Sequence, residues 1–125
     1  MPDHRGNLTF VEGGRHVPFE IRRVFYLYDV PAGQRRAGHA LKDIQQILVA
    51  VSGSFDVVVD SGQERTKVTL NRPSMGLYLP SLVWRELENF SSGSVCLVLA
   101  SERYSEESYY RDYYEFLAAL ERAGE

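Results

Sequence analysis

Residues 33–42 are the part of the chain on which the predicted fold and chemistry are centred. They read Gly33-Gln34-Arg35-Arg36-Ala37-Gly38-His39-Ala40-Leu41-Lys42. An apolar run from Ile44 to Val51 and a turn at Gly53 follow directly. A histidine, two adjacent arginines and a lysine therefore gather just before a β-rich run. We expect any chemistry of this protein to centre on them.

The composition is that of one globular domain spanning residues 1–125. At this length roughly two thirds of the surface of the unfolded chain can be buried, and 44% hydrophobic and 25% charged residues are ordinary values. No apolar run approaches the roughly 20 residues that cross a membrane. The polar start Met1-Pro2-Asp3-His4-Arg5 lacks the apolar core of a signal peptide. We therefore expect a cytoplasmic protein with no membrane partner.

The net charge of −3 argues against nucleic acid as a partner, because binding phosphate backbones needs a basic surface. A local arginine cluster can still hold an anionic ligand. The single cysteine, Cys96, lies within the apolar run 94–99 and is predicted to be a small buried hydrophobe rather than a reactive thiol. With one cysteine, the chain cannot form an internal disulfide.

Short runs of apolar residues, many of them β-branched or aromatic, recur between turn signals over residues 5–101. They lie at 7–12, 20–29, 44–51, 55–59, 65–70, 76–79 and 95–99. Residues 60–63 have the composition of a hairpin loop. Several short strands at this spacing predict an all-β sandwich or barrel.

The tail, residues 105–122, is predicted to be a helix that Ser105 caps. One face of that helix would carry an apolar stripe formed by Tyr109, Tyr113, Phe116, Leu117 and Leu120. The stripe is most simply a packing face against the β body or a partner subunit. Stacking of its tyrosines on a ligand is the alternative.

The central stretch has the spacing of a known motif. Five residues separate Gly33 from His39, one separates His39 from Leu41, four separate Leu41 from Gln46, and six separate Gln46 from Gly53. This frame resembles the first cupin motif, which normally supplies two histidines and a glutamate as metal ligands.

Residues 80–89 resemble the second cupin motif, with Arg85 where that motif supplies its last histidine. Of the four ligands that the two motifs imply, His39 alone remains. Neither leucine nor arginine is a ligand for a divalent metal. We therefore predict a site without metal or other cofactor.

Nearly the whole chain is similar to the small metal-free cupins that act as dTDP-4-keto-6-deoxyglucose 3,4-ketoisomerases, a WxcM-like family. The matching segments are 3–8, 17–26, 36–42, 53–54, 76–78, Trp84 and 99–113. The resemblance implies a jelly-roll barrel with a short C-terminal helix, and a homodimer with exchanged strands. It also implies that the barrel binds a nucleotide-diphosphate sugar linked to dTDP.

One departure from the family bears on activity. The family motif reads His-Ala-His-Lys, whereas this chain has His39-Ala40-Leu41-Lys42. Side chains two apart on a strand point to the same face, so Leu41 is expected beside His39, where the family has its favoured general base. Arg85 likewise replaces a histidine that the family often has after its tryptophan.

A 3,4-ketoisomerase moves a ketone between C4 and C3 through an enediol, which needs a base, a donor to the oxyanion and a clamp on the diphosphate. We predict His39 as the base, since the ordinary pKa of histidine lies near neutrality. Tyr26 is predicted to donate to the enediolate or to relay a proton. Arg23 and Arg36 are the predicted diphosphate clamp, because guanidinium groups match phosphate oxygens.

The resemblance adds Lys42, Trp84 and Arg85 as substrate-binding residues. Trp84 and His39 also have purely structural interpretations: Trp84 as packing, and His39 as a hydrogen-bonded structural residue. Two further functions stay open at this point. The protein can be a catalytically silent cupin that binds a nucleotide sugar or supports a partner enzyme, or a cupin for another sugar nucleotide in which Arg85 binds a carboxylate or an extra phosphate.

Overall fold

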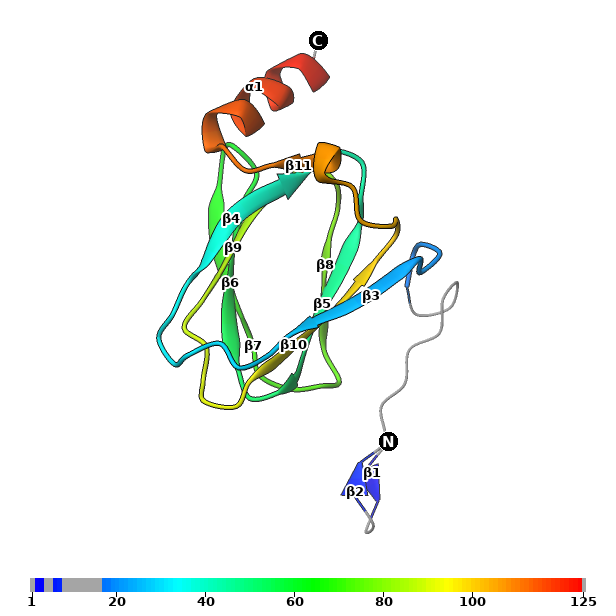
Figure 1. Cartoon of the computed structure of the whole chain (residues 1–125), viewed down its shortest axis with the longest axis vertical. Helices are drawn as coiled ribbons and strands as arrows, with labels where there is room; N and C mark the ends of the chain where they lie inside the picture. The colour runs from blue at the N-terminus through cyan, green and yellow to red at the C-terminus, as the bar shows by residue number, and fades with distance from the viewer. Residues whose placement is uncertain (1, 4–5, 8–16, 125) are drawn as a thin grey trace.

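The computed structural model describes residues 2–3, 6–7 and 17–124, in which two antiparallel sheets face each other with a helix at one end (Figure 1). The four-stranded sheet has the order β3 (Arg23–Leu27), β10 (Val95–Ala100), β5 (Gln46–Ser52) and β8 (Gly76–Leu79). The five-stranded sheet has the order β11 (Tyr109–Tyr110), β4 (Arg36–Leu41), β9 (Trp84–Glu88), β6 (Phe55–Asp60) and β7 (Arg65–Leu70). A separate two-stranded sheet pairs β1 (Pro2–Asp3) with β2 (Gly6–Asn7). The helix is α1 (Tyr113–Ala123). The predicted all-β cupin jelly-roll class with a short C-terminal helix is confirmed.

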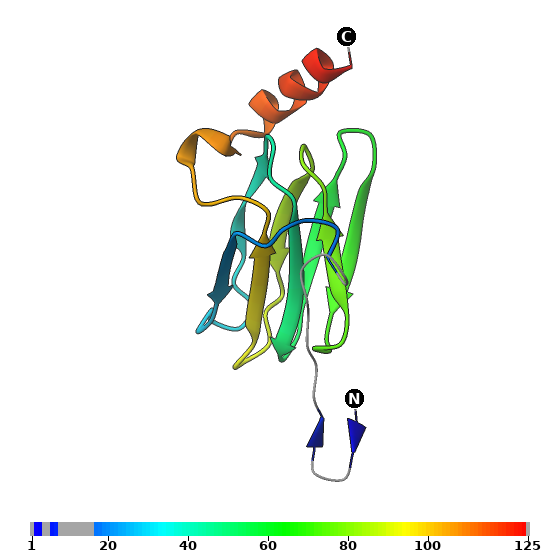
Figure 2. The same ribbon diagram turned by 90° about the vertical axis from the view of Figure 1, so that its right-hand side faces the viewer.

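The core lies between the two large sheets, which Figure 2 shows from the side. Its buried side chains include Leu48, Ala50, Phe55, Val57, Leu70, Leu79, Leu87, Phe90, Cys96 and Val98. Alternate residues of each strand point into this layer, and each large side chain so buried stabilises the fold by about 1.5–3 kcal/mol. Burial also raises the pKa of the Cys96 thiol to about 12. Cys96 is therefore the buried hydrophobe that the sequence predicts.

The apolar runs predict most of the strands well, and β7 and β8 have the predicted bounds. Within the strand predicted at 20–29, the structure has the shorter strand β3. Most of the strand predicted at 7–12 lies outside the described residues. The pattern missed β9 as a strand. Three of its five residues are charged, two of them glutamates on its outer face, so it does not read as an apolar run.

The helix begins later than predicted, at Tyr113 rather than near Ser105. Ser105 makes no capping hydrogen bond through its side chain and instead precedes a short 3-10 turn, Glu106–Ser108. Tyr109 and Tyr110 then pair with β4 as a strand. Helical periodicity alone cannot reveal this pairing, since it depends on a distant part of the chain. The remaining members of the predicted stripe do pack on the β body, around Trp84.

A β-bulge in β4 sets the direction of the residues in the central stretch. Arg36 lies opposite Leu87 and His39 lies opposite Arg85, so three steps along β4 match two steps along β9. Cross-strand partners point to the same face of a sheet. Arg36 and His39 therefore share the inner face with Leu87 and Arg85. In a regular strand, residues three apart would point to opposite faces.

Gly38 makes room for this bulge. A β-carbon built on Gly38 would lie 2.5 Å from Cζ2 and 2.7 Å from Nε1 of the Trp84 indole. Trp84 is buried on the other side by Tyr113 and Phe116 of α1, with ring centroids 5.3 and 5.8 Å away. The indole cannot move aside without disturbing the helix.

We expect Asp112→Ala to lower the free energy of unfolding by about 1 kcal/mol. The Asp112 side chain accepts hydrogen bonds from the backbone N–H groups of Tyr114 at 2.8 Å and Glu115 at 3.4 Å. Urea denaturation measures the loss. Ser105→Ala is the matched control and should change stability by less than about 0.5 kcal/mol. Equal losses in the two variants would contradict the observed helix start.

Gly38→Ala should destabilise the protein by about 1–3 kcal/mol, because the added methyl group overlaps the Trp84 ring. Urea denaturation again gives the value. The control is a double-variant cycle with Trp84→Phe, in which the smaller ring should reduce the cost of the methyl group. A cost that is the same in both backgrounds would show that Trp84 is not what excludes a side chain at this position.

Candidate active site

A cavity of about 460 Å³ opens on the inner face of β4. Its apolar wall is formed by Phe25, Leu27 and Leu87. Its polar lining consists of Arg35, Arg36, His39, Tyr109 and Arg111. Three guanidinium groups and no carboxylate line it, so it favours an anionic ligand of which one part is apolar or ring-shaped.

Tyr109 lies against His39 in this cavity, with ring centroids 5.2 Å apart and planes tilted by 45°. The pairing of β11 with β4 places Tyr109 there, opposite Leu41. Arg23 donates from Nη1 to the Tyr109 hydroxyl at 3.5 Å. The same guanidinium lies over the Phe25 ring, 4.2 Å from its centroid. Arg23 thus supports the cavity wall from the neighbouring sheet.

Arg111 reaches the cavity from the residue pair that joins β11 to α1. Its Nε and Nη2 donate to the two carboxylate oxygens of Glu106 at 2.8 and 3.0 Å. The hydrogen bond from Arg111, assisted by one from Tyr104, lowers the pKa of Glu106 to about 2. The guanidinium also lies 4.7 Å from the centre of the Tyr109 ring. The exposed carboxylate therefore orients Arg111 and leaves three of its five N–H groups for other partners.

Arg85 lies deeper, with only 1% of its surface exposed. Its Nη1 donates to Gln46 Oε1 at 2.7 Å, while Nη2 has no hydrogen-bond partner among the described residues. Burial lowers the pKa of Arg85 to about 10, so it remains a cation at neutral pH. No carboxylate in the described part of the chain forms an ion pair with it. The inner face of the barrel is thus positive beneath His39 as well as around it.

Leu41 shares the inner face with His39 but is fully buried. It packs with Ile44 and Ala100, and Tyr109 covers this cluster. The leucine therefore lies under the cavity wall and does not open into the cavity beside His39.

Three predicted site residues point away from this cavity. Tyr26 is 59% exposed and lies on the outer face of β3, where its ring contacts Tyr28. Lys42 extends over the Tyr110 ring. Trp84 is buried under α1 and donates from Nε1 to Glu86 Oε2 at 2.9 Å. The alternation of side chains along the strands separates all three from His39.

The remaining four predicted residues belong to the cavity or adjoin it: His39 and Arg36 line it, and Arg23 and Arg85 lie behind its wall. Arg111 was missed, and Tyr109 was predicted only as a helix residue that packs on the β body or stacks on a ligand. Their place follows from the short β11 strand, for which two adjacent tyrosines inside a predicted helix gave no signal. Side chains two residues apart on an extended chain point to the same face, and Tyr109 and Arg111 have this spacing. The sequence does not show, however, that this segment is extended and pairs with β4.

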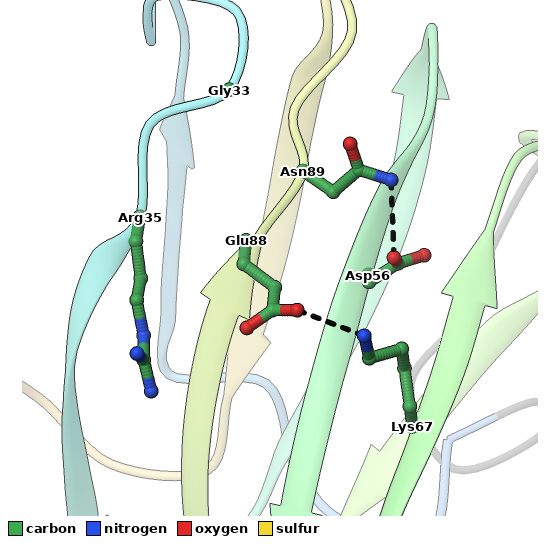
Figure 3. A pocket seen from close by; sticks show the side chains of 6 residues that line it. All are labelled: Gly33, Arg35, Asp56, Lys67, Glu88 and Asn89. Carbon is green, nitrogen blue, oxygen red and sulfur yellow. Dashed lines mark hydrogen bonds and ion pairs between the residues drawn. The ribbon is translucent and has the colours of Figure 1, made fainter.

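A second hollow, of about 360 Å³, lies on the outer face of the five-stranded sheet (Figure 3). Two carboxylates, Asp56 and Glu88, balance its two cations, Arg35 and Lys67. Lys67 Nζ lies 3.0 Å from Glu88 Oε2, and Asp56 accepts hydrogen bonds from Thr69 Oγ1 at 2.6 Å and Asn89 Nδ2 at 3.2 Å. It therefore offers less attraction to an anion than the cavity around His39.

The described residues contain neither a metal-binding cluster nor a membrane-spanning helix. No three His, Cys, Asp or Glu side chains among them converge in a way that could hold a metal ion. In the same residues, no helix has the length and apolar character that crossing a membrane requires.

Comparison with known proteins identifies relatives over nearly the whole chain. The family model described as FdtA, WxcM-like, C-terminal matches residues 1–121. The chain is 41% identical over 114 residues to the TDP-4-oxo-6-deoxy-α-D-glucose-3,4-oxoisomerase of Aneurinibacillus thermoaerophilus, a match that covers 91% of this chain and 82% of the relative.

Solved structures agree with this. The WlaRB TDP-quinovose 3,4-ketoisomerase of Campylobacter jejuni is 44% identical with a TM-score of 0.90, covering 94% of this chain and 91% of that one. QdtA, a sugar 3,4-ketoisomerase of Thermoanaerobacterium thermosaccharolyticum solved in complex with TDP, is 40% identical with a TM-score of 0.94, covering 98% and 90%. Since the family model spans all but the last few residues, the chain belongs to the FdtA, WxcM-like C-terminal family.

Proposed function

We propose that this protein is a metal-independent sugar-nucleotide 3,4-ketoisomerase that acts on a TDP-linked 4-keto-6-deoxyhexose. The observation that carries the proposal is the cavity that places His39 among Arg35, Arg36 and Arg111. Relatives at 40–44% identity are named as isomerases of this kind. They favour this function over a catalytically silent cupin.

The arginines are suited to the diphosphate of the substrate. A guanidinium group binds phosphate oxygens through two parallel hydrogen bonds and stays charged. Arg36 is directed inward by the bulge, and Arg111 is held by Glu106 at the same opening. Arg35 has a second role, because it also pairs with Glu86 on the outer face. We therefore assign the diphosphate first to Arg36 and Arg111.

The sugar then lies against the apolar wall of the cavity, which is formed by Phe25, Leu27 and Leu87. His39 is the group there that can remove a proton from the carbon next to the ketone. The buried cation of Arg85 lies on the same face and favours the negative charge that develops on the enediolate. The site thus contains a base and positive charge for both the diphosphate and the intermediate.

The purified protein should convert TDP-4-keto-6-deoxyglucose to the 3-keto isomer, followed by proton NMR in deuterated buffer. His39→Asn should lower kcat by roughly 10²–10⁴-fold, the usual contribution of a general base. Lys67→Gln, in the hollow of Figure 3, is the control and should retain wild-type kcat/KM. A wild-type protein that binds TDP but neither forms the isomer nor exchanges deuterium would refute the proposed function.

A homodimer is part of this proposal. β3 is an edge strand of its sheet among the described residues, and its Val24 and Tyr26, with Tyr28 just after its end, form an outward stripe with exposed fractions of 54%, 59% and 60%. An exposed apolar stripe on an edge strand is typical of a surface that another chain covers. Tyr26 therefore has a role in assembly in place of the predicted catalytic one. The predicted cytoplasmic location stays a prediction.

Light scattering after size exclusion should give twice the chain mass of 14.3 kDa for the wild type. Tyr26→Lys should shift the protein toward the monomer, because it places a charge in the covered stripe. The matched control is Tyr114→Lys on α1, where the side chain is 80% exposed; this variant should remain dimeric. A monomeric wild type would contradict the assembly.

A further inference from the structure

Two groups that can each carry a proton face one another in the cavity. The His39 imidazole and the Tyr109 phenol have centroids 5.2 Å apart, and both line the same space. A 3,4-ketoisomerase must move two protons, one bound to carbon and one bound to oxygen. The described lining contains one candidate carrier for each.

We propose that Tyr109, rather than Tyr26, is the hydroxyl group of the reaction, and that His39 and Tyr109 divide the two protons between them. His39 carries the carbon-bound proton from C3 to C4. Tyr109 carries the oxygen-bound proton from O3 to O4. This inference rests on the proposed function and explains how one imidazole is enough when Leu41 is buried beneath it.

The first step forms the enediol. His39 removes the proton from C3, and the C3–H electron pair becomes the C3=C4 double bond. The π pair of the C4 ketone moves to O4, which takes the proton of the Tyr109 hydroxyl. The site then holds an enediol, an imidazolium and a phenolate, and the net charge is unchanged.

The second step reverses the roles at the other carbon. The Tyr109 phenolate removes the proton from O3, and the released pair forms the C3 ketone. The C3=C4 pair takes the proton from the His39 imidazolium to form C4–H. Every bond broken is matched by one formed, and no oxidant or reductant is needed.

Positive charge surrounds the phenol that must become transiently negative. Arg23 donates to its oxygen from β3, and Arg111 lies over its ring. The buried Arg85 on β9 interacts electrostatically with Tyr109. Cations fixed in a site with little water stabilise a developing anion without reorganising. The guanidinium groups come from three separate segments, so the arrangement is a property of the folded barrel.

Tyr26 has none of these contacts. It lies on the outer face of β3, and its ring neighbour is Tyr28, 5.7 Å away. The inward residues on either side of it are Phe25 and Leu27, which have no ionisable group. A hydroxyl acting on a sugar in this cavity therefore has to come from another element.

The test compares Tyr109→Phe with Tyr26→Phe, with Tyr114→Phe as an exposed control. Tyr109→Phe should lower kcat at least about 100-fold while KM and the affinity for TDP change less than about threefold, since the ring remains. Tyr26→Phe and Tyr114→Phe should keep kcat within about threefold of the wild type. A loss below about tenfold in Tyr109→Phe, or a larger loss in Tyr26→Phe, would overturn the inference. An inactive wild type would overturn the proposed function along with it.

A second substitution at Tyr109 tests the inference even if Tyr109→Phe fails to fold. Replacement of Tyr109 by 3-fluorotyrosine keeps the hydroxyl and makes the phenol more acidic. The alkaline limb of the kcat/KM profile should then move to lower pH. Arg23, His39, Arg85, Arg111 and Tyr104 are the charged or titratable groups that face this phenol, and none of them is altered. An alkaline limb that stays in place would show that Tyr109 carries no proton.

Discussion

The pairing of β4 with β9 determines which side chains the protein presents to its cavity. One extra residue in β4 brings Arg36 and His39 to the same face, and Gly38 allows it because the Trp84 indole occupies the space where a side chain would be. Trp84 is itself held by α1. The direction of His39 thus depends on the packing of the C-terminal helix on the opposite side of the sheet.

Charge is divided between the two faces of this sheet. The inner face carries guanidinium groups, of which the buried Arg85 forms no ion pair among the described residues, whereas the outer face has carboxylates that are closely paired. Burial alone would raise the pKa of Asp60, but hydrogen bonds from the Gly62 N–H, the Tyr113 hydroxyl and Arg65 lower it overall. Tyr113 belongs to α1, so the hydrogen bond that helps keep Asp60 ionised also fastens the helix to the sheet.

The sequence predicts where most of the strands lie and the identity of the central motif, because both depend on local spacing. It also predicts that His39 and Arg36 lie close together, and both line the cavity. It does not predict that Tyr26 faces away from that cavity, because its face is set by the register of β3, or that Tyr109 and Arg111 line it, because β11 pairs with a strand far away in the chain. Leu41 is correctly expected on the inner face, but only packing with Ile44 and Ala100 shows that it is buried.

The central claim is that the sugar lies between His39 and Tyr109 with its diphosphate at the arginines. A crystal structure of the protein with TDP-4-keto-6-deoxyglucose measures this directly. We expect the His39 imidazole to lie about 3–3.5 Å from C3 or C4, and Arg36 or Arg111 to contact the diphosphate. A sugar bound elsewhere, such as the outer hollow at Asp56 and Lys67, with no ligand atom near His39, would contradict the account.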